Sequence, residues 1–174
     1  MGNPGLIKDL MLEFLEVKNF REIQIVADLA HRIWNEHYVP IIGQEQVDYM
    51  LAKFQSIPAI EEQIEQASRY YLIRLENEDI GYFSLNLHEK EQSLELSKLY
   101  VQKEYKGRKI GRKAVEFIQA LGRQLGAKKI FLSVNKYNPS IAAYESMGFK
   151  CKQAVVQDIG AGFVMDDYVY EKEI

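Results

Sequence analysis

The clearest candidate for chemistry is a segment in which a short apolar strand, Leu99–Val101, leads through a basic loop into a long helix. The first turn of a helix has main-chain N–H groups without acceptors, and the helix dipole adds a partial positive charge there. Such a turn binds phosphate, and glycines let the main chain come close to it. The pattern therefore predicts a pyrophosphate site. The residues assigned to it are Leu99, Tyr100, Val101, Lys106, Gly107, Arg108, Lys109, Ile110, Gly111 and Arg112.

Two familiar phosphate-binding motifs do not describe this segment. A dinucleotide-binding fingerprint needs three glycines at fixed spacing, and a P-loop needs a Gly-Lys-Ser/Thr sequence after its first glycine. Neither pattern is present around Gly107. The solvated, basic start of an ordinary helix is an alternative interpretation, which these residues alone leave open.

Other reactive side chains are sparse. Cys151 is the single cysteine, so it cannot form an internal disulfide, and only three histidines remain as imidazole ligands. These counts exclude a cysteine-rich metal centre. We expect no metal ion, and we expect Cys151 to be a small buried residue rather than a nucleophile.

The elements that must position the basic loop follow from the spacing of apolar residues. A first strand is expected at Leu10–Val17, then helices after a capping box at Asn19, over Gln44–Phe54 and from Pro58. Alternation predicts an antiparallel meander of strands at 69–75, 80–87 and 94–101. After the loop we expect a helix to Leu125, a strand at 130–134, a short helix capped by Asn138, and two closing strands near 149–156 and 163–171.

Composition narrows the class of protein. The 174 residues, 47% hydrophobic and 27% charged, fit one domain spanning 1–174. No apolar run reaches the roughly 18 residues of a membrane helix, and Met1–Leu6 lacks the apolar stretch of a secretory signal, so we expect a cytoplasmic protein without membrane contact. The formal net charge of −3 argues against a nucleic-acid partner.

Two blocks resemble the GCN5-related N-acetyltransferase (GNAT) superfamily. Leu99–Ala114 resembles its motif A, Q/R-x-x-G-x-G/A, with Lys106 at the Gln/Arg position, Lys109 at the first glycine and Gly111 at the second. Ile130–Phe149 resembles motif B, a strand and a helix ending in Gly-Phe. Lys106 keeps the charge of the motif, whereas Lys109 puts a side chain where the family has none, and we expect that side chain to point away from the ligand.

The resemblance implies an α+β fold, with a mixed, mostly antiparallel central sheet that splays between its fourth and fifth strands and carries helices on both faces. It implies acetyl-CoA as co-substrate, with Asn135 and Asn138 joining the loop as cofactor-binding residues. The implied reaction is direct transfer of an acetyl group to a primary amine of a small molecule or peptide. A homodimer is possible, as it is common in the family.

The resemblance also assigns two catalytic residues. Tyr144 occupies the position of the family's catalytic tyrosine, the general acid for the coenzyme A thiolate. Glu95 lies eleven residues before Lys106, where the histone-acetylating branch carries its catalytic glutamate, and would act as base through water. Strand alternation puts Glu95 on one face with Ser93 and Ser97. A core tyrosine and a solvent-facing glutamate are the structural alternatives.

The acceptor is left open. The stretch Trp34–Phe54 weakly resembles bacterial spermidine/spermine acetyltransferases, and Trp34 and His37 are candidate acceptor contacts. The Asp158–Asp167 segment either lines the acceptor side, where acidic groups attract a cationic amine, or is a solvated loop. Two other functions compete with catalysis. They are a non-catalytic acyl-CoA-binding sensor of the same fold, and an RNA-binding domain using Lys103–Lys113.

Overall fold

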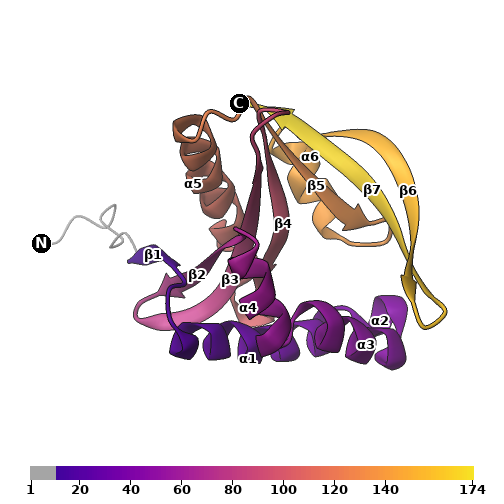
Figure 1. The fold of residues 1–174 in the computed structure, drawn as a ribbon. Coiled ribbons are helices and arrows are strands. Elements are labelled where there is room, and N and C mark those ends of the chain that lie inside the picture. The colour runs from indigo at the N-terminus through magenta and orange to yellow at the C-terminus, as the bar shows by residue number, and fades with distance from the viewer. Residues whose placement is uncertain (1–10) are drawn as a thin grey trace, which may run out of the picture.

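A computed structural model of the protein describes residues 11–174, which form a single seven-stranded sheet with helices packed against it (Figure 1). The strand order is β1-β2-β3-β4-β5-β7-β6, and all neighbours are antiparallel except β4 and β5, which are parallel. The predicted α+β architecture is therefore confirmed. The strands are β1 (Leu12–Glu16), β2 (Arg69–Leu75), β3 (Glu78–His88), β4 (Ser93–Val101), β5 (Lys129–Asn135), β6 (Lys150–Gly160) and β7 (Phe163–Glu173).

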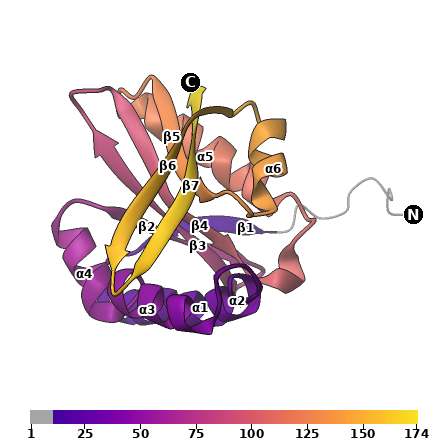
Figure 2. The ribbon, with the colours of Figure 1, turned by 90° about the vertical axis from the view of Figure 1, so that its right-hand side faces the viewer.

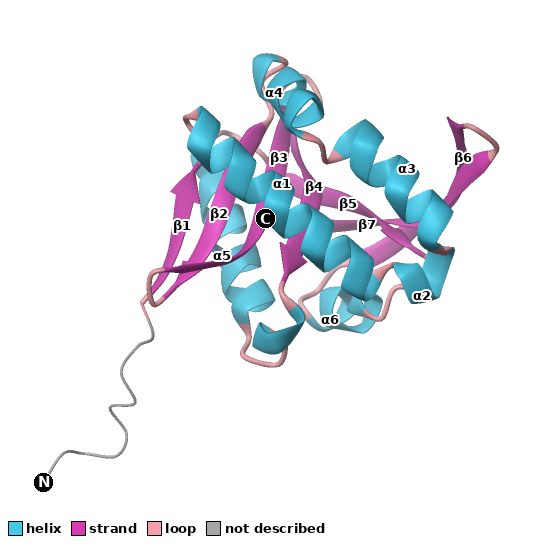
Figure 3. Ribbon diagram, turned by 90° about the horizontal axis from the view of Figure 1, so that it is seen from below, coloured by secondary structure: helices cyan, strands magenta, loops and turns pink. Residues whose placement is uncertain are grey.

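Helices cover both faces of the sheet, and each face has its own apolar core. Figure 3 shows α1 running across the strands of one face. The helices of that face are α1 (Phe20–His37), α2 (Val39–Ile42), α3 (Gln44–Phe54) and α4 (Ile57–Glu65), and those of the opposite face are α5 (Ile110–Gln124) and α6 (Ser140–Ser146).

The local sequence explains where these helices begin. The Asn19 side chain accepts the Glu22 N–H at 2.9 Å, and the Glu22 carboxylate accepts the Asn19 N–H at 3.2 Å, which completes the predicted capping box. Ser56 caps α4, with a proline in its first turn. Gly43 has a φ of 86° between α2 and α3, a conformation that costs little only for glycine. The short helix α2 was not predicted.

The first predicted strand begins later than expected. β1 starts at Leu12, whereas Leu10 and the Met1–Leu6 segment lie outside the described residues. The other predicted strands are all present; β2 has both predicted ends, and the ends of the others differ by at most four residues. For instance, β6 runs to Gly160 rather than stopping at Val156.

β4 carries the irregularity that shapes the centre of the protein. Ser84 of β3 pairs with Lys98, whereas the next residue of β3, Leu85, pairs with Leu96, so Ser97 is an extra, bulged residue. The bulge reverses the alternation of the strand. Leu96 before it faces the core under α5, whereas Tyr100 after it faces the core under α1.

β4 and β5 pair over only three residues each, Ser93–Glu95 with Lys129–Phe131. Beyond Glu95 the two strands diverge, as Figure 1 shows. The sheet is thus splayed between its fourth and fifth strands, as the resemblance implies.

β6 and β7 form a hairpin that reaches back to α3 (Figure 2). The Tyr49 hydroxyl donates to the Ile159 carbonyl at 2.6 Å, and the Gln46 side chain donates to the Val164 carbonyl at 2.8 Å. Cys151 on β6 is exposed, so the expectation that it is buried is wrong. The reason is that β6 is the edge strand of the sheet.

Candidate active site

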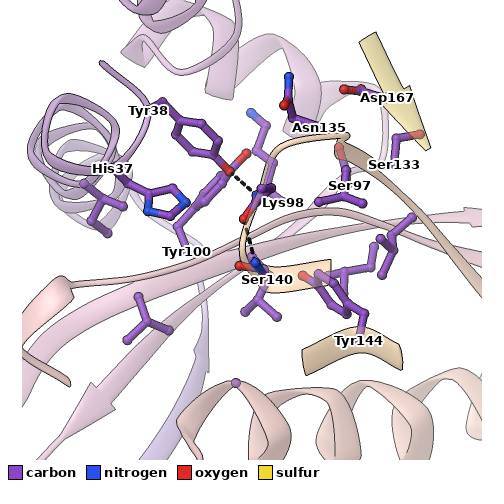
Figure 4. Close-up of a pocket in the computed structure, with 18 of the residues that line it drawn as sticks. His37, Tyr38, Ser97, Lys98, Tyr100, Ser133, Asn135, Ser140, Tyr144 and Asp167 are labelled. Carbon is purple, nitrogen blue, oxygen red and sulfur yellow. Dashed lines mark hydrogen bonds between the residues drawn. The ribbon is translucent and has the colours of Figure 1, made fainter. Parts of the chain in front are cut away.

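A pocket of about 1220 Å³ opens where β4 leaves β5. Its walls come from both strands, from β7, from the loop before α5 and from α6 (Figure 4). The helices α1 to α4, on the other face of the sheet, complete the lining. The splay thus gathers residues that are far apart in the sequence. Of the predicted site residues, those that line it are Glu95, Leu99, Tyr100, Val101, Lys106, Gly107, Lys109, Ile110, Gly111, Arg112, Asn135, Asn138 and Tyr144.

The loop before α5 presents main-chain donors to this pocket. Lys109 adopts a left-handed conformation, with a φ of 60°, and turns the chain into the helix. The first hydrogen bond of α5 runs from the Lys113 N–H to the Lys109 carbonyl, so the three N–H groups before Lys113 have no acceptor within the helix. A Cβ on Gly111 would meet no atom within 4 Å, so the space in front of the turn is open. The geometry fits an anion of pyrophosphate size.

The basic side chains of the loop take different directions. Lys106 Nζ lies 3.1 Å from His37 Nδ1, and Arg112 donates to the Ser146 hydroxyl of α6 at 3.4 Å. Burial, and then the charge of Lys106, lower the pKa of His37, so the neutral ring can accept a hydrogen bond from the Lys106 ammonium. Arg108 does not line the pocket. Its guanidinium instead lies over the ring of Tyr105, 5.4 Å from the centroid.

Tyr144 lies on α6 and faces the pocket (Figure 4). Its ring packs edge-on against Phe149, with 5.7 Å between the ring centroids. Burial raises the pKa of Tyr144 to about 12, so the phenol keeps its proton at neutral pH. The side chain can therefore donate a hydrogen bond to a group bound in the pocket.

Glu95 lies at the end of the pocket where β4 and β5 are still paired. Its carboxylate accepts a hydrogen bond from Asn86 at 3.4 Å and lies 3.2 Å from His88 Nε2. Ser93 and Glu95 both precede the bulge and keep the predicted common face, whereas Ser97 is the bulged residue and does not continue it.

Lys98 is a pocket residue that sequence reasoning missed. The bulge turns it inward, where its ammonium donates to the Phe54 carbonyl at 2.6 Å, the Gln63 side chain at 2.9 Å and the Tyr70 hydroxyl. It is only 7% exposed, and this burial lowers its pKa to about 7. A lysine directly before the run Leu99–Val101, which lines the core and the pocket, was the available signal.

Asp167 belongs to the segment that the sequence analysis assigned either to the acceptor side of the site or to a solvated loop. The Asp158–Asp167 segment is not a solvated loop, because strand residues occupy all of it except the turn at Ala161–Gly162. Asp167 is 8% exposed and lines the pocket, as the sequence analysis allowed. Figure 4 shows it near Asn135, across the pocket from Tyr38.

Tyr38 closes the pocket beside the first helix. Its hydroxyl accepts a hydrogen bond from the Asn138 side chain at 3.1 Å, and its ring lies 4.3 Å from that of Trp34. Asn138 also accepts the Ser140 N–H at 2.9 Å, so this predicted cofactor-binding residue holds the start of α6. The helix begins at Ser140, one residue after the predicted Pro139.

The sequence matches a known family over most of its length. The profile of the acetyltransferase (GNAT) family matches residues 27–149, which include both the loop before α5 and Tyr144. No curated protein sequence matches the chain. Within residues 11–174, no group of three or more His, Cys, Asp or Glu could hold a metal ion, and no helix is long and apolar enough to cross a membrane.

Solved structures with a similar fold are numerous. The PaiA N-acetyltransferase from Thermoplasma acidophilum in complex with coenzyme A superposes with a TM-score of 0.79 at 19% identity, over 95% of this chain and 100% of that one. A GCN5-related N-acetyltransferase from Rhodopseudomonas palustris gives 0.77 at 14% identity, over 95% and 96%. The spermidine N-acetyltransferase from Vibrio cholerae in complex with CoA and spermine gives 0.69 at 17% identity, over 93% and 95%. At these identities the likeness shows the fold.

Proposed function

The chain belongs to the acetyltransferase (GNAT) family, and we propose that it transfers the acetyl group of acetyl-CoA directly to a primary amine of a small molecule or peptide. One observation carries the proposal. The turn that begins α5 directs unbonded main-chain N–H groups into a pocket that continues along the gap between β4 and β5. A diphosphate at the turn, with an extended arm in the gap, fits this shape.

The residues of the turn fit coenzyme A in charge as well as in shape. The N–H groups before Lys113, the helix dipole, and the side chains of Lys106 and Arg112 all favour an anion at this point. Coenzyme A carries a pyrophosphate and a 3′-phosphate, and its acetyl thioester supplies the activated acyl group. Similarity to the Thermoplasma acidophilum structure, which contains coenzyme A, supports the same reading.

The splay of the sheet supplies hydrogen-bond donors for the reaction. Beyond Glu95, the main-chain groups of β4 that point toward β5 have no partner strand. N–H groups fixed in this way stabilise the negative charge that develops on a carbonyl oxygen under attack. Loss of one such donor costs roughly 10²–10³ in rate.

Two side chains handle the protons. As the C–N bond forms and the C–S bond breaks, the attacking amine loses a proton and the leaving sulfur gains one. Tyr144 is protonated at neutral pH, and burial raises its pKa further, to about 12, so its hydroxyl can donate to the sulfur. Glu95, held by Asn86 and His88, is the candidate base through water. Each such group contributes roughly 10²–10⁴ in rate.

The structural neighbours favour a small amine as acceptor. The Vibrio cholerae spermidine N-acetyltransferase structure contains spermine. The pocket of this chain is of ample size for a small amine in addition to a thioester arm.

The test is release of the coenzyme A thiol from acetyl-CoA in the presence of a panel of alkyl monoamines, diamines, polyamines and a lysine peptide. We expect turnover with at least one amine, and a fall in kcat of about 10²–10⁴ for Tyr144→Phe with acetyl-CoA affinity retained. Tyr137→Phe is the matched control, because Tyr137 is 76% exposed. A purified protein that shows no calorimetric binding of acetyl-CoA would overturn the proposal, and unchanged turnover of Tyr144→Phe would remove Tyr144 from it.

A further inference from the structure

Asp167 is a buried carboxylate for which residues 11–174 provide no counter-ion. It is 8% exposed on β7, between Asn135 of β5 and Val155 of β6. Within residues 11–174, its side chain takes part in no ion pair and no hydrogen bond, although it lines the pocket. A buried charge without a partner is costly, so this arrangement calls for a cation from outside the chain.

Two neighbouring acids of the hairpin have partners within the chain, which sets Asp167 apart. Asp166 forms an ion pair with Lys136, with 2.7 Å between Oδ1 and Nζ, and Asp158 accepts the Gly160 N–H at 2.8 Å. Burial, and then the Asp166 carboxylate, raise the pKa of Asp167 to about 6. Asp167 therefore still carries its negative charge at neutral pH.

The buried lysine of the same pocket does not neutralise this carboxylate. The three donors of the Lys98 ammonium are directed to Phe54, Gln63 and Tyr70, on the side of α4 and β2. Lys98 is thus fixed by neutral acceptors, and Asp167 stays open to a ligand.

The surroundings of Asp167 suit an alkyl chain that carries a positive charge. Tyr38 faces it across the pocket (Figure 4), and the pKa of the Tyr38 hydroxyl is raised by burial first, then by Tyr144, and also by the Asp167 carboxylate. The wall of the same pocket includes the apolar side chains of Met50, Ile159 and Met165.

We propose that the Asp167 carboxylate binds the ammonium group of the acceptor, and so selects alkyl amines, which are cationic at neutral pH, over neutral aryl amines and alcohols. This inference rests on the proposed function for the identity of the ligand as an acceptor. The binding site itself does not require acetyl transfer. Its charge selectivity can therefore be tested separately.

The experiment compares butylammonium with 1-butanol, its neutral counterpart, by ligand-observed NMR on the protein alone. We expect wild type to bind butylammonium in preference to butanol, and Asp167→Asn to weaken butylammonium binding by about 30-fold or more while leaving butanol unchanged. Asp166→Asn is the matched control, because Asp166 is already paired with Lys136, and it should retain the preference.

Equal binding of the two probes by wild type, or an equal loss in both variants, would overturn the site. If Asp167→Asn does not fold, the comparison of the two probes on wild type decides alone. Charge-selective binding in a protein that does not release thiol from acetyl-CoA would refute the proposed function and retain the site. Thiol release without charge-selective binding would do the opposite.

Discussion

If the Asp167 carboxylate is paired only when a cationic ligand is bound, removing its charge should increase the unfolding free energy of the ligand-free protein. The change is Asp167→Asn, which keeps the size of the side chain. Folding raises the pKa of Asp167 from 3.8 to about 6, so the folded protein binds the proton more tightly than the unfolded chain does. The wild type therefore loses stability as the pH rises through this window.

The magnitude follows from the two pKa values. A shift of about two units corresponds to about 3 kcal/mol of unfolding free energy above pH 6, to about 1.5 kcal/mol near pH 5, and to almost nothing below pH 4. Asp167→Asn lacks this titration, so it should exceed wild type by up to these amounts, the gap growing from pH 4 to pH 8. Urea unfolding at pH 5 and pH 8 measures the difference.

Asp166→Asn provides the control, because it removes an ion pair with Lys136 in which both side chains are partly exposed. This loss should destabilise the protein by about 0–1 kcal/mol. The reasoning is refuted if Asp167→Asn is no more stable than wild type at pH 8, or if its advantage is independent of pH. A stabilised variant that also loses butylammonium binding would show that the carboxylate is kept for its ligand rather than for the fold.

Three substitutions test the other parts of the site. Gly111→Val places its Cβ in open space, so we expect a folded protein whose Kd for coenzyme A by calorimetry rises about 10-fold or more, and unchanged affinity would contradict the phosphate site. Lys109→Gly removes the backbone strain of a non-glycine residue in the left-handed conformation, so urea unfolding should show an unfolding free energy about 1 kcal/mol higher than that of wild type. Arg108→Gly should not show this increase, and a decrease for Lys109→Gly would contradict the strain argument. Gly81→Ala brings a Cβ to 2.3 Å from the Tyr100 carbonyl oxygen, so we expect the unfolding free energy to fall by at least about 2 kcal/mol. Gly111→Ala is the control, because its Cβ meets no atom within 4 Å. An equal effect of the two substitutions would show that the β3–β4 contact can relax.

Elements with local signals were predictable from the sequence. The capping box at Asn19, the proline at the start of α4 and the alternation of β2 to β4 act within a few residues, and each gave an element that the structure contains. The helix α2 was missed because four residues are too few to show a helical period. The loop before α5 was likewise predictable, since a strand, a basic glycine loop and a helix follow one another along the chain.

The side chains that meet across the pocket were less accessible to sequence reasoning. A bulge is set by pairing between two strands and by the core on each face, so nothing near Ser97 marks it as the extra residue of β4. Strict alternation then holds from Ser93 to Leu96, but it assigns the wrong face to the residues after Ser97 and fails to bring Lys98 inward. Glu95 itself still lines the pocket, because it precedes the bulge.

The two buried charges of the pocket have different purposes, and their hydrogen bonds show the difference. If Lys98 and Asp167 served only to offset each other, they would be in contact, yet the ion pairs within residues 11–174 do not include one between them. Lys98 has all three donors bonded, and it thereby ties β4 beside its bulge to the carbonyl that ends α3 and to α4. Asp167 has no such bonds within residues 11–174, and a partly desolvated anion without a partner costs the fold stability. Lys98 therefore fixes the position of β4, which lines the pocket, and the Asp167 carboxylate is the charge that we propose to pair with the ammonium group of the acceptor.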